Sequence, residues 1–140
     1  MLMDNLTRFQ LDGEVLLVMC MESEPEIYPG VTCHVYQFIG DLRQDLAIVE
    51  IEAEGKTPAQ EVQEGERTVQ LYVSGEGSLI VIREDGKKEV FEAKKDLAVE
   101  INVGDKMQWK AAKGKKLVFA EMCRPRYAEG RYKNLVEDLD

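Results

Sequence analysis

Residues 67–86 read RTVQLYVSGEGSLIVIREDG, and this stretch contains the pattern that decides the fold class. Two runs rich in β-branched and aromatic residues, 67–74 and 78–83, are separated by glycines, and the second run ends at Glu84-Asp85-Gly86. Short runs bounded by glycine turns are typical of β-strands, and Asp-Gly is a strong hairpin signal. The stretch therefore predicts strands that pair through tight turns.

The same pattern continues through most of the chain. The sequence contains 11 glycines, many of them about ten residues apart, a spacing typical of turns in β-sandwiches and β-barrels. The other predicted strands are 14–21, 31–38, 46–53, 87–92, 97–101, 106–110 and 116–123. We therefore predict an all-β fold. Helical spacing is clearest in Tyr127 to Leu139, where it predicts a short C-terminal helix with an apolar stripe: Tyr132, Leu135, Val136 and Leu139.

Composition narrows the class of protein further. The 140 residues are 44% hydrophobic and 32% charged, with a formal net charge of −9, as expected for one soluble domain spanning residues 1–140. The longest apolar run, 15–21, is too short to cross a bilayer, and the acidic balance argues against nucleic-acid binding. The three cysteines are widely spaced and odd in number, which indicates reduced thiols in a cytoplasmic protein.

Two predicted strands carry the polar side chains of interest. In 67–74, Thr68, Gln70 and Tyr72 share one face, and an aliphatic face lies opposite. The polar face either lines a cavity or meets water, and the alternation does not decide between them. In 116–123, Glu121 is the only carboxylate in an apolar strand. Burial would raise the pKa of this carboxyl and suit it to acid/base catalysis. The alternative is a structural glutamate paired with Arg67 or Arg124.

Residues 55–75, GKTPAQEVQEGERTVQLYVSG, resemble the first motif of the cupin superfamily in the spacing of their glycines and in the Thr-Pro pair. Val103-Gly104-Asp105 resembles the turn that opens the second cupin motif, and the ending 119–127 is similar to the close of small single-domain cupins. The resemblance covers residues 46–133. It implies a jelly-roll β-barrel, commonly a homodimer, with a ligand cavity inside. The N-terminal extension strands would occupy about 1–45, the barrel motifs about 46–126 and the tail 127–140.

The metal ligands of that family are missing from this sequence. The resemblance places the two histidines of its first motif on Glu61 and Gln63, and its glutamate on Thr68. His34 is the only histidine of the chain, so the sequence cannot provide several imidazole ligands. We expect no metal and no cofactor. A weak Mg, Ca or Mn site with oxygen ligands from Glu61, Gln63 and Glu121 is the alternative.

The resemblance also implies which residues face the barrel interior. The predicted ligand-binding residues are Glu61, Gln63, Gln70, Tyr72 and Trp109, and the predicted catalytic residues are Glu121 and Glu61. An acid, two amides and a phenol recognise hydroxyl and carbonyl groups.

These residues lead to three hypotheses about function. The first is a metal-free cupin-like barrel that binds a small polar metabolite, sugar-like or a keto acid. The second is a metal-independent isomerase, epimerase or lyase. The third is a degenerate barrel with a structural or interaction role. Whether the protein is an enzyme stays open at this point.

Overall fold

The computed structural model describes residues 6–11, 14–38, 45–65, 67–124 and 130–139, and the regular secondary structure of these residues is β-strand. The nine predicted strand segments are all strands, so the all-β prediction is confirmed. The strands are β1 (Leu6–Leu11), β2 (Glu14–Tyr28), β3 (Val31–Phe38), β4 (Asp45–Ile51), β5 (Gln60–Val62), β6 (Arg67–Gly75), β7 (Gly77–Ile82), β8 (Lys88–Glu92), β9 (Ala98–Ile101), β10 (Lys106–Ala111), β11 (Leu117–Arg124) and β12 (Tyr132–Asn134).

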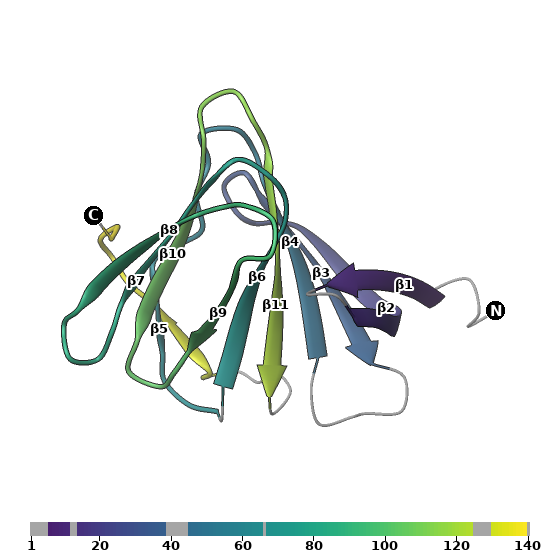
Figure 1. Cartoon of the computed structure of the whole chain (residues 1–140), viewed down its shortest axis with the longest axis horizontal. Coiled ribbons are helices and arrows are strands. Elements are labelled where there is room, and N and C mark those ends of the chain that lie inside the picture. The colour runs from purple at the N-terminus through teal and green to yellow at the C-terminus, as the bar shows by residue number, and fades with distance from the viewer. Residues whose placement is uncertain (1–5, 12–13, 39–44, 66, 125–129, 140) are drawn as a thin grey trace.

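The strands form two antiparallel sheets that face each other (Figure 1). One sheet has seven strands in the order β1-β2-β3-β4-β11-β6-β9, and the other has five in the order β12-β5-β10-β7-β8. Strands that are distant in sequence become neighbours: β11 lies between β4 and β6, and β10 lies between β5 and β7. This arrangement brings residues near positions 46, 70 and 120 together. No helix of membrane-spanning length and hydrophobicity occurs in the described residues.

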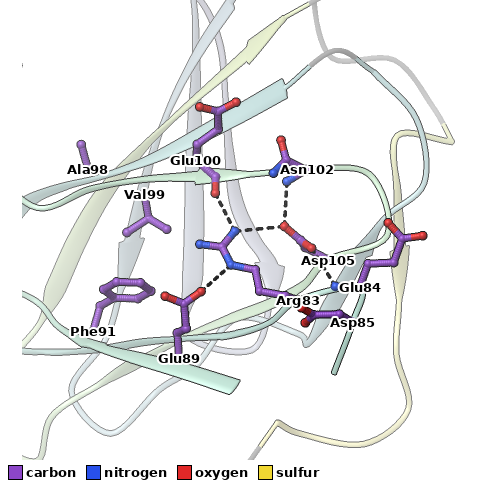
Figure 2. A pocket seen from close by; sticks show the side chains of 10 residues that line it. All are labelled: Arg83, Glu84, Asp85, Glu89, Phe91, Ala98, Val99, Glu100, Asn102 and Asp105. Carbon is purple, nitrogen blue, oxygen red and sulfur yellow. Dashed lines mark hydrogen bonds and ion pairs between the residues drawn. The ribbon is translucent and has the colours of Figure 1, made fainter. Parts of the chain in front are cut away.

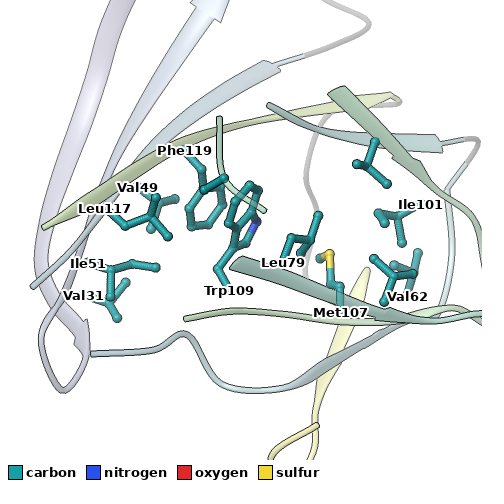
Figure 3. Close-up of a cluster of buried hydrophobic side chains, with 13 residues drawn as sticks. Val31, Val49, Ile51, Val62, Leu79, Ile101, Met107, Trp109, Leu117 and Phe119 are labelled. Carbon is teal, nitrogen blue, oxygen red and sulfur yellow. The ribbon is translucent and has the colours of Figure 1, made fainter. Parts of the chain in front are cut away.

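The main hydrophobic core fills the space between the sheets (Figure 3). Trp109 from the five-stranded sheet and Phe119 from the seven-stranded sheet stack with their ring centroids 4.6 Å apart. Aliphatic side chains, among them Ile51, Leu79 and Leu117, are fully buried around this pair. Aromatic and aliphatic burial of this kind supplies most of the driving force for folding.

Alternation along the central strands separates their two faces, as predicted. On β11, Phe119 belongs to the inner core, and Val118 and Ala120 belong to a second cluster. On β6, Leu71 joins that second cluster, and Gln70 and Thr68 are fully buried on the opposite face. The polar face of β6 therefore points into the barrel and not toward bulk water.

Two glycine turns join the predicted strands around β7. Gly75, at φ +92°, lies so close to β11 that a Cβ there would be 1.9 Å from the carbonyl oxygen of Lys116. Gly86, at φ +91°, forms the β7–β8 hairpin, where its N–H donates to the carbonyl of Arg83 at 2.8 Å. The Asp-Gly signal therefore predicted the hairpin correctly.

The predicted C-terminal helix is wrong for the described residues 130–139, which contain no helix; residues 127–129 lie outside the described part. Tyr132 to Asn134 form β12, which pairs antiparallel with β5. Leu135 and Leu139 then pack near Ala59, and Val136, which the helix would have placed beside them, is fully exposed. An edge strand offers unpaired backbone groups, and here pairing with β5 replaces helix formation.

Candidate functional site

A cavity of about 650 Å³ opens between the two sheets. Its lining comes from the end of β2, from β3, β4 and β11, and from the 57–60 segment and β12. Aromatic and aliphatic walls surround a few polar groups, among which Glu121 from β11, Asp45 from β4 and Tyr132 from β12 come together. This size and mixture of walls are typical of sites for small organic ligands.

Glu121 is the centre of the polar groups in this cavity. Its Oε1 accepts hydrogen bonds from Tyr132 Oη, from Thr68 Oγ1 at 3.4 Å and from Cys123 Sγ at 3.7 Å. Tyr132 Oη also lies 3.1 Å from Cys123 Sγ and 3.1 Å from Thr68 Oγ1. Hydroxyl and thiol groups therefore surround Oε1 of Glu121, and the amide of Gln70 is a further partner of the carboxyl.

Burial raises the pKa of Glu121 from 4.5 to about 7. Removal of the carboxylate from water is the largest cause, and the negative charge of Asp45 acts in the same direction. Hydrogen bonds from Gln70, Cys123 and Thr68 oppose the rise and do not overcome it. Glu121 therefore changes charge close to neutral pH, where a general acid or base works well.

A chain of buried hydrogen bonds connects Glu121 to the core. Gln70 Nε2 donates to Thr68 Oγ1 at 3.3 Å, and Trp109 Nε1 donates to Gln70 Oε1 at 2.9 Å. Thr68 and Gln70 are both fully buried, so the polar groups beside Glu121 are held by neighbours that water does not reach. Buried and mutually bonded groups of this kind fix the position of the carboxyl they support.

None of the five residues predicted to bind a ligand is among the residues that line this cavity, and the five separate into two groups. Gln70 belongs to the hydrogen-bond chain behind Glu121, and Trp109 contacts this chain from the core. Tyr72 packs against the main core, and its hydroxyl donates to the carbonyl of Gly75 at 2.9 Å.

The other two predicted residues, Glu61 and Gln63, are hydrogen-bonded to each other, and neither lines the cavity. On β5 the inward side chains are Gln60 and Val62: Gln60 lines the cavity and Val62 is part of the core. Glu61 lies on the opposite face of this strand, because successive side chains alternate.

Tyr132 and Asp45 are polar groups beside Glu121 that sequence reasoning missed. Tyr132 lies in the tail that was predicted to be helical, and only its pairing with β5 brings it to Glu121. Asp45 begins β4 and reaches the cavity because β4 pairs with β11, where Asp45 is opposite Cys123. No local pattern identifies either residue, since both depend on strand pairing.

The donor set does not fit the transition-metal site implied by the resemblance. At the three positions matched to first-motif ligands, Glu61 and Gln63 face away from the cavity, and Thr68 is bonded into the Glu121 group. The only histidine, His34, is bonded to Ser23 and Glu50, each at 2.8 Å, on the face of β3 opposite the cavity residues Cys33 and Val35. The described residues contain no group of three or more His, Cys, Asp or Glu side chains arranged to hold a metal ion.

A second depression, of about 840 Å³, opens beside β7, β8 and β9 (Figure 2). Its centre is Arg83, which donates to Glu89 at 2.6 Å, to Asp105 at 3.0 Å and to the backbone carbonyl of Glu100 at 2.8 Å. The other carboxylate oxygen of Asp105 accepts from the backbone N–H of Glu84 at 2.9 Å. These charged groups bind each other and join two turns, so the depression is explained as a structural ion-pair cluster.

The sequence matches no family model, and no curated protein matches it. Solved structures do match. A cupin-2 domain of Rhodospirillum rubrum has a TM-score of 0.65 at 20% identity, over 86% of this chain and 76% of that one. Bacillus subtilis oxalate decarboxylase, a protein with Mn(II) centres, has a TM-score of 0.67 at 19% identity, over 80% of this chain and 30% of that one. Another oxalate decarboxylase structure reaches a TM-score of 0.69 at 19% identity, with 84% and 31% coverage. Similarity at this level of identity shows a shared fold. It does not show a shared activity.

Proposed function

Because the chain has the cupin fold, we propose that it binds a small polar organic molecule in the cavity beside Glu121. The observation that supports this function most is the convergence of Glu121, Tyr132 and Asp45 in a cavity of about 650 Å³ with aromatic walls. Polar groups that converge in an otherwise apolar cavity provide orientation and specificity, and the apolar walls contribute affinity.

The polar groups favour a ligand rich in hydrogen-bond donors. The carboxylate oxygens of Glu121 and Asp45 accept hydrogen bonds, and the amides of Gln37, Gln60 and Asn134 in the same lining both accept and donate. A sugar-like molecule provides such donors. A keto acid would bring its own negative charge next to Asp45 and Glu121, and like charges repel. Of the two ligand classes predicted from the sequence, the sugar-like class is therefore favoured.

A thermal-shift screen tests the binding function. Sugars, nucleotide sugars and keto acids are added to the purified protein and to two variants, Glu121→Gln in the cavity and Glu92→Gln on an exposed position of β8. A ligand at 100 times its dissociation constant adds about 2.7 kcal/mol to the free energy of unfolding. We expect this gain in the wild type and in Glu92→Gln, and a smaller gain in Glu121→Gln. A panel without any hit, or a hit unaffected by Glu121→Gln, contradicts the proposal.

Acid/base catalysis is the second candidate function, and the raised pKa of Glu121 favours it. Glu121 would take or give a proton, and Tyr132 Oη, which donates to Glu121 Oε1, would support either charge state. Once a ligand is found, loss of turnover with retained binding and fold in Glu121→Gln would support catalysis.

The homodimer and the cytoplasmic location are also proposals. Light scattering tests the first, and cell fractionation tests the second.

A further inference from the structure

We infer that the molecule held in this cavity carries a positive charge, on an ammonium or quaternary ammonium group that lies beside Glu121 and Asp45. This inference rests on the proposed binding function and specifies the class of ligand. Two independent features of the cavity support it: the sign of its charged groups and the number of its aromatic rings.

The charged groups of the cavity are all acidic. Among the described lining residues, Glu121 and Asp45 carry carboxylates, and none is lysine, arginine or histidine. Arg131, which is itself buried, is a positive charge that acts on the Cys123 thiol. The negative charges of Glu121 and Asp45 raise the pKa of the Cys123 thiol, and the positive charge of Arg131 lowers it. The effect of each carboxylate is larger than that of Arg131. Two carboxylates in a lining without a basic side chain favour a cation over an anion.

The second feature is the aromatic wall. Tyr28, Phe119 and Tyr132 line the cavity from three different strands. The face of an aromatic ring is electron-rich and attracts ammonium groups, more strongly when water is excluded. Carboxylates alone would suit a metal ion or a hydroxyl-rich ligand. Carboxylates with several aromatic rings favour an organic cation that has an apolar part.

The groups around Glu121 also give the binding a pH dependence. Glu121 is approached by Asp45 from β4, Thr68 and Gln70 from β6, Cys123 from β11 itself and Tyr132 from β12, with Arg131 just before that strand. Among these groups, Glu121 has a pKa raised by burial to about 7. A ligand of fixed positive charge should therefore bind more tightly as Glu121 ionises with rising pH.

Choline and two molecules of nearly the same shape test the inference by titration calorimetry. The neutral molecule is 3,3-dimethylbutan-1-ol and the anionic one is 3,3-dimethylbutyrate. Glucosamine, glucose and glucuronate form a second set with a different shape. Within a set, we expect the cation to bind about ten-fold more tightly than the neutral molecule, since desolvated ammonium–aromatic and ammonium–carboxylate contacts are together worth at least that factor. The anion should bind most weakly.

Variants of cavity residues test whether the preference for choline arises in the cavity. Glu121→Gln should weaken choline binding about ten-fold and remove its increase between about pH 6 and pH 8, because the amide keeps the shape and loses the charge. Tyr28→Leu should weaken choline more than 3,3-dimethylbutan-1-ol, since leucine keeps an apolar wall without a ring face. The exposed Glu92→Gln is the matched control and should change neither affinity.

The outcomes separate this inference from the proposed function. Neutral molecules that bind as tightly as the cations, with binding lost in a cavity variant, would support a polar ligand site and overturn the positive charge. Choline binding unchanged in both Glu121→Gln and Tyr28→Leu would place the cation outside the cavity and also overturn the inference. A failure of all six molecules and of the sugar and keto-acid panel would overturn both.

Discussion

Replacing Glu121 by glutamine should change how the stability of the protein depends on pH. The carboxyl has a pKa of about 7 in the folded chain, against an ordinary value of 4.5. Between these two values the folded protein holds a proton that the unfolded chain has released, so stability falls as the pH rises. At about 1.4 kcal/mol per pKa unit, the ionised carboxylate costs the fold about 3 kcal/mol once the pH exceeds about 8. Below about pH 4 both states are protonated and the cost vanishes.

The assay is urea unfolding of the wild type and Glu121→Gln at a series of pH values, followed by the fluorescence of Trp109, the only tryptophan. Glutamine keeps an oxygen that accepts the hydrogen bonds of Tyr132 and Thr68. The variant should therefore gain about 3 kcal/mol relative to the wild type between about pH 4 and pH 8. Glu92→Gln, on the exposed face of β8, should follow the wild type. A difference between wild type and Glu121→Gln that is the same at every pH would refute the reasoning.

Three further predictions concern the scaffold and the thiol. Gly75→Ala should destabilise the fold by about 3 kcal/mol, because the new Cβ would lie 1.9 Å from the Lys116 carbonyl oxygen. Gly86→Ala should cost only about 1 kcal/mol, because nothing lies within 4 Å of its Cβ. Equal losses of the two variants in urea unfolding would contradict this prediction. Asp105→Ala should lose about 3 kcal/mol in the same assay, since it removes the buried carboxylate to which Arg83 and the backbone N–H of Glu84 donate. A loss below about 0.5 kcal/mol would contradict a structural role for this carboxylate. Burial and the nearby carboxylates raise the pKa of the Cys123 thiol, so iodoacetamide should label this thiol only in unfolded protein. Peptide mass spectrometry measures the labelling. Rapid labelling of the native protein would contradict the burial of Cys123.

The sequence was most informative where a property depends on local spacing. The glycine turns and the β-branched and aromatic runs predicted nine strands, and the alternation in 67–74 separated the polar face of β6 from its aliphatic face without deciding which one points inward. Glu121 was identified for the same reason, because one carboxylate in an apolar strand has to be buried.

Residues whose role depends on pairing between distant segments could not be placed in this way. Glu61 and Gln63 were expected inside from the spacing of a motif, and β5 instead directs Gln60 inward. Tyr132 shares a helical spacing with Leu135 and Leu139, and that spacing also fits a short strand followed by turns. A one-residue change of register moves a side chain to the other face of a strand, and local sequence does not fix the register of a three-residue strand such as β5.

The most direct test of the cavity as a binding site for a cation is the titration of the Glu121 carboxyl carbon by ¹³C NMR, with and without saturating choline. Comparison with Glu121→Gln assigns the signal. We predict a midpoint near 7 in the free protein. Bound choline should lower this midpoint, because a positive charge beside the carboxylate stabilises its ionised form. A midpoint near the ordinary value of 4.5, or one that choline leaves unchanged, would contradict the account.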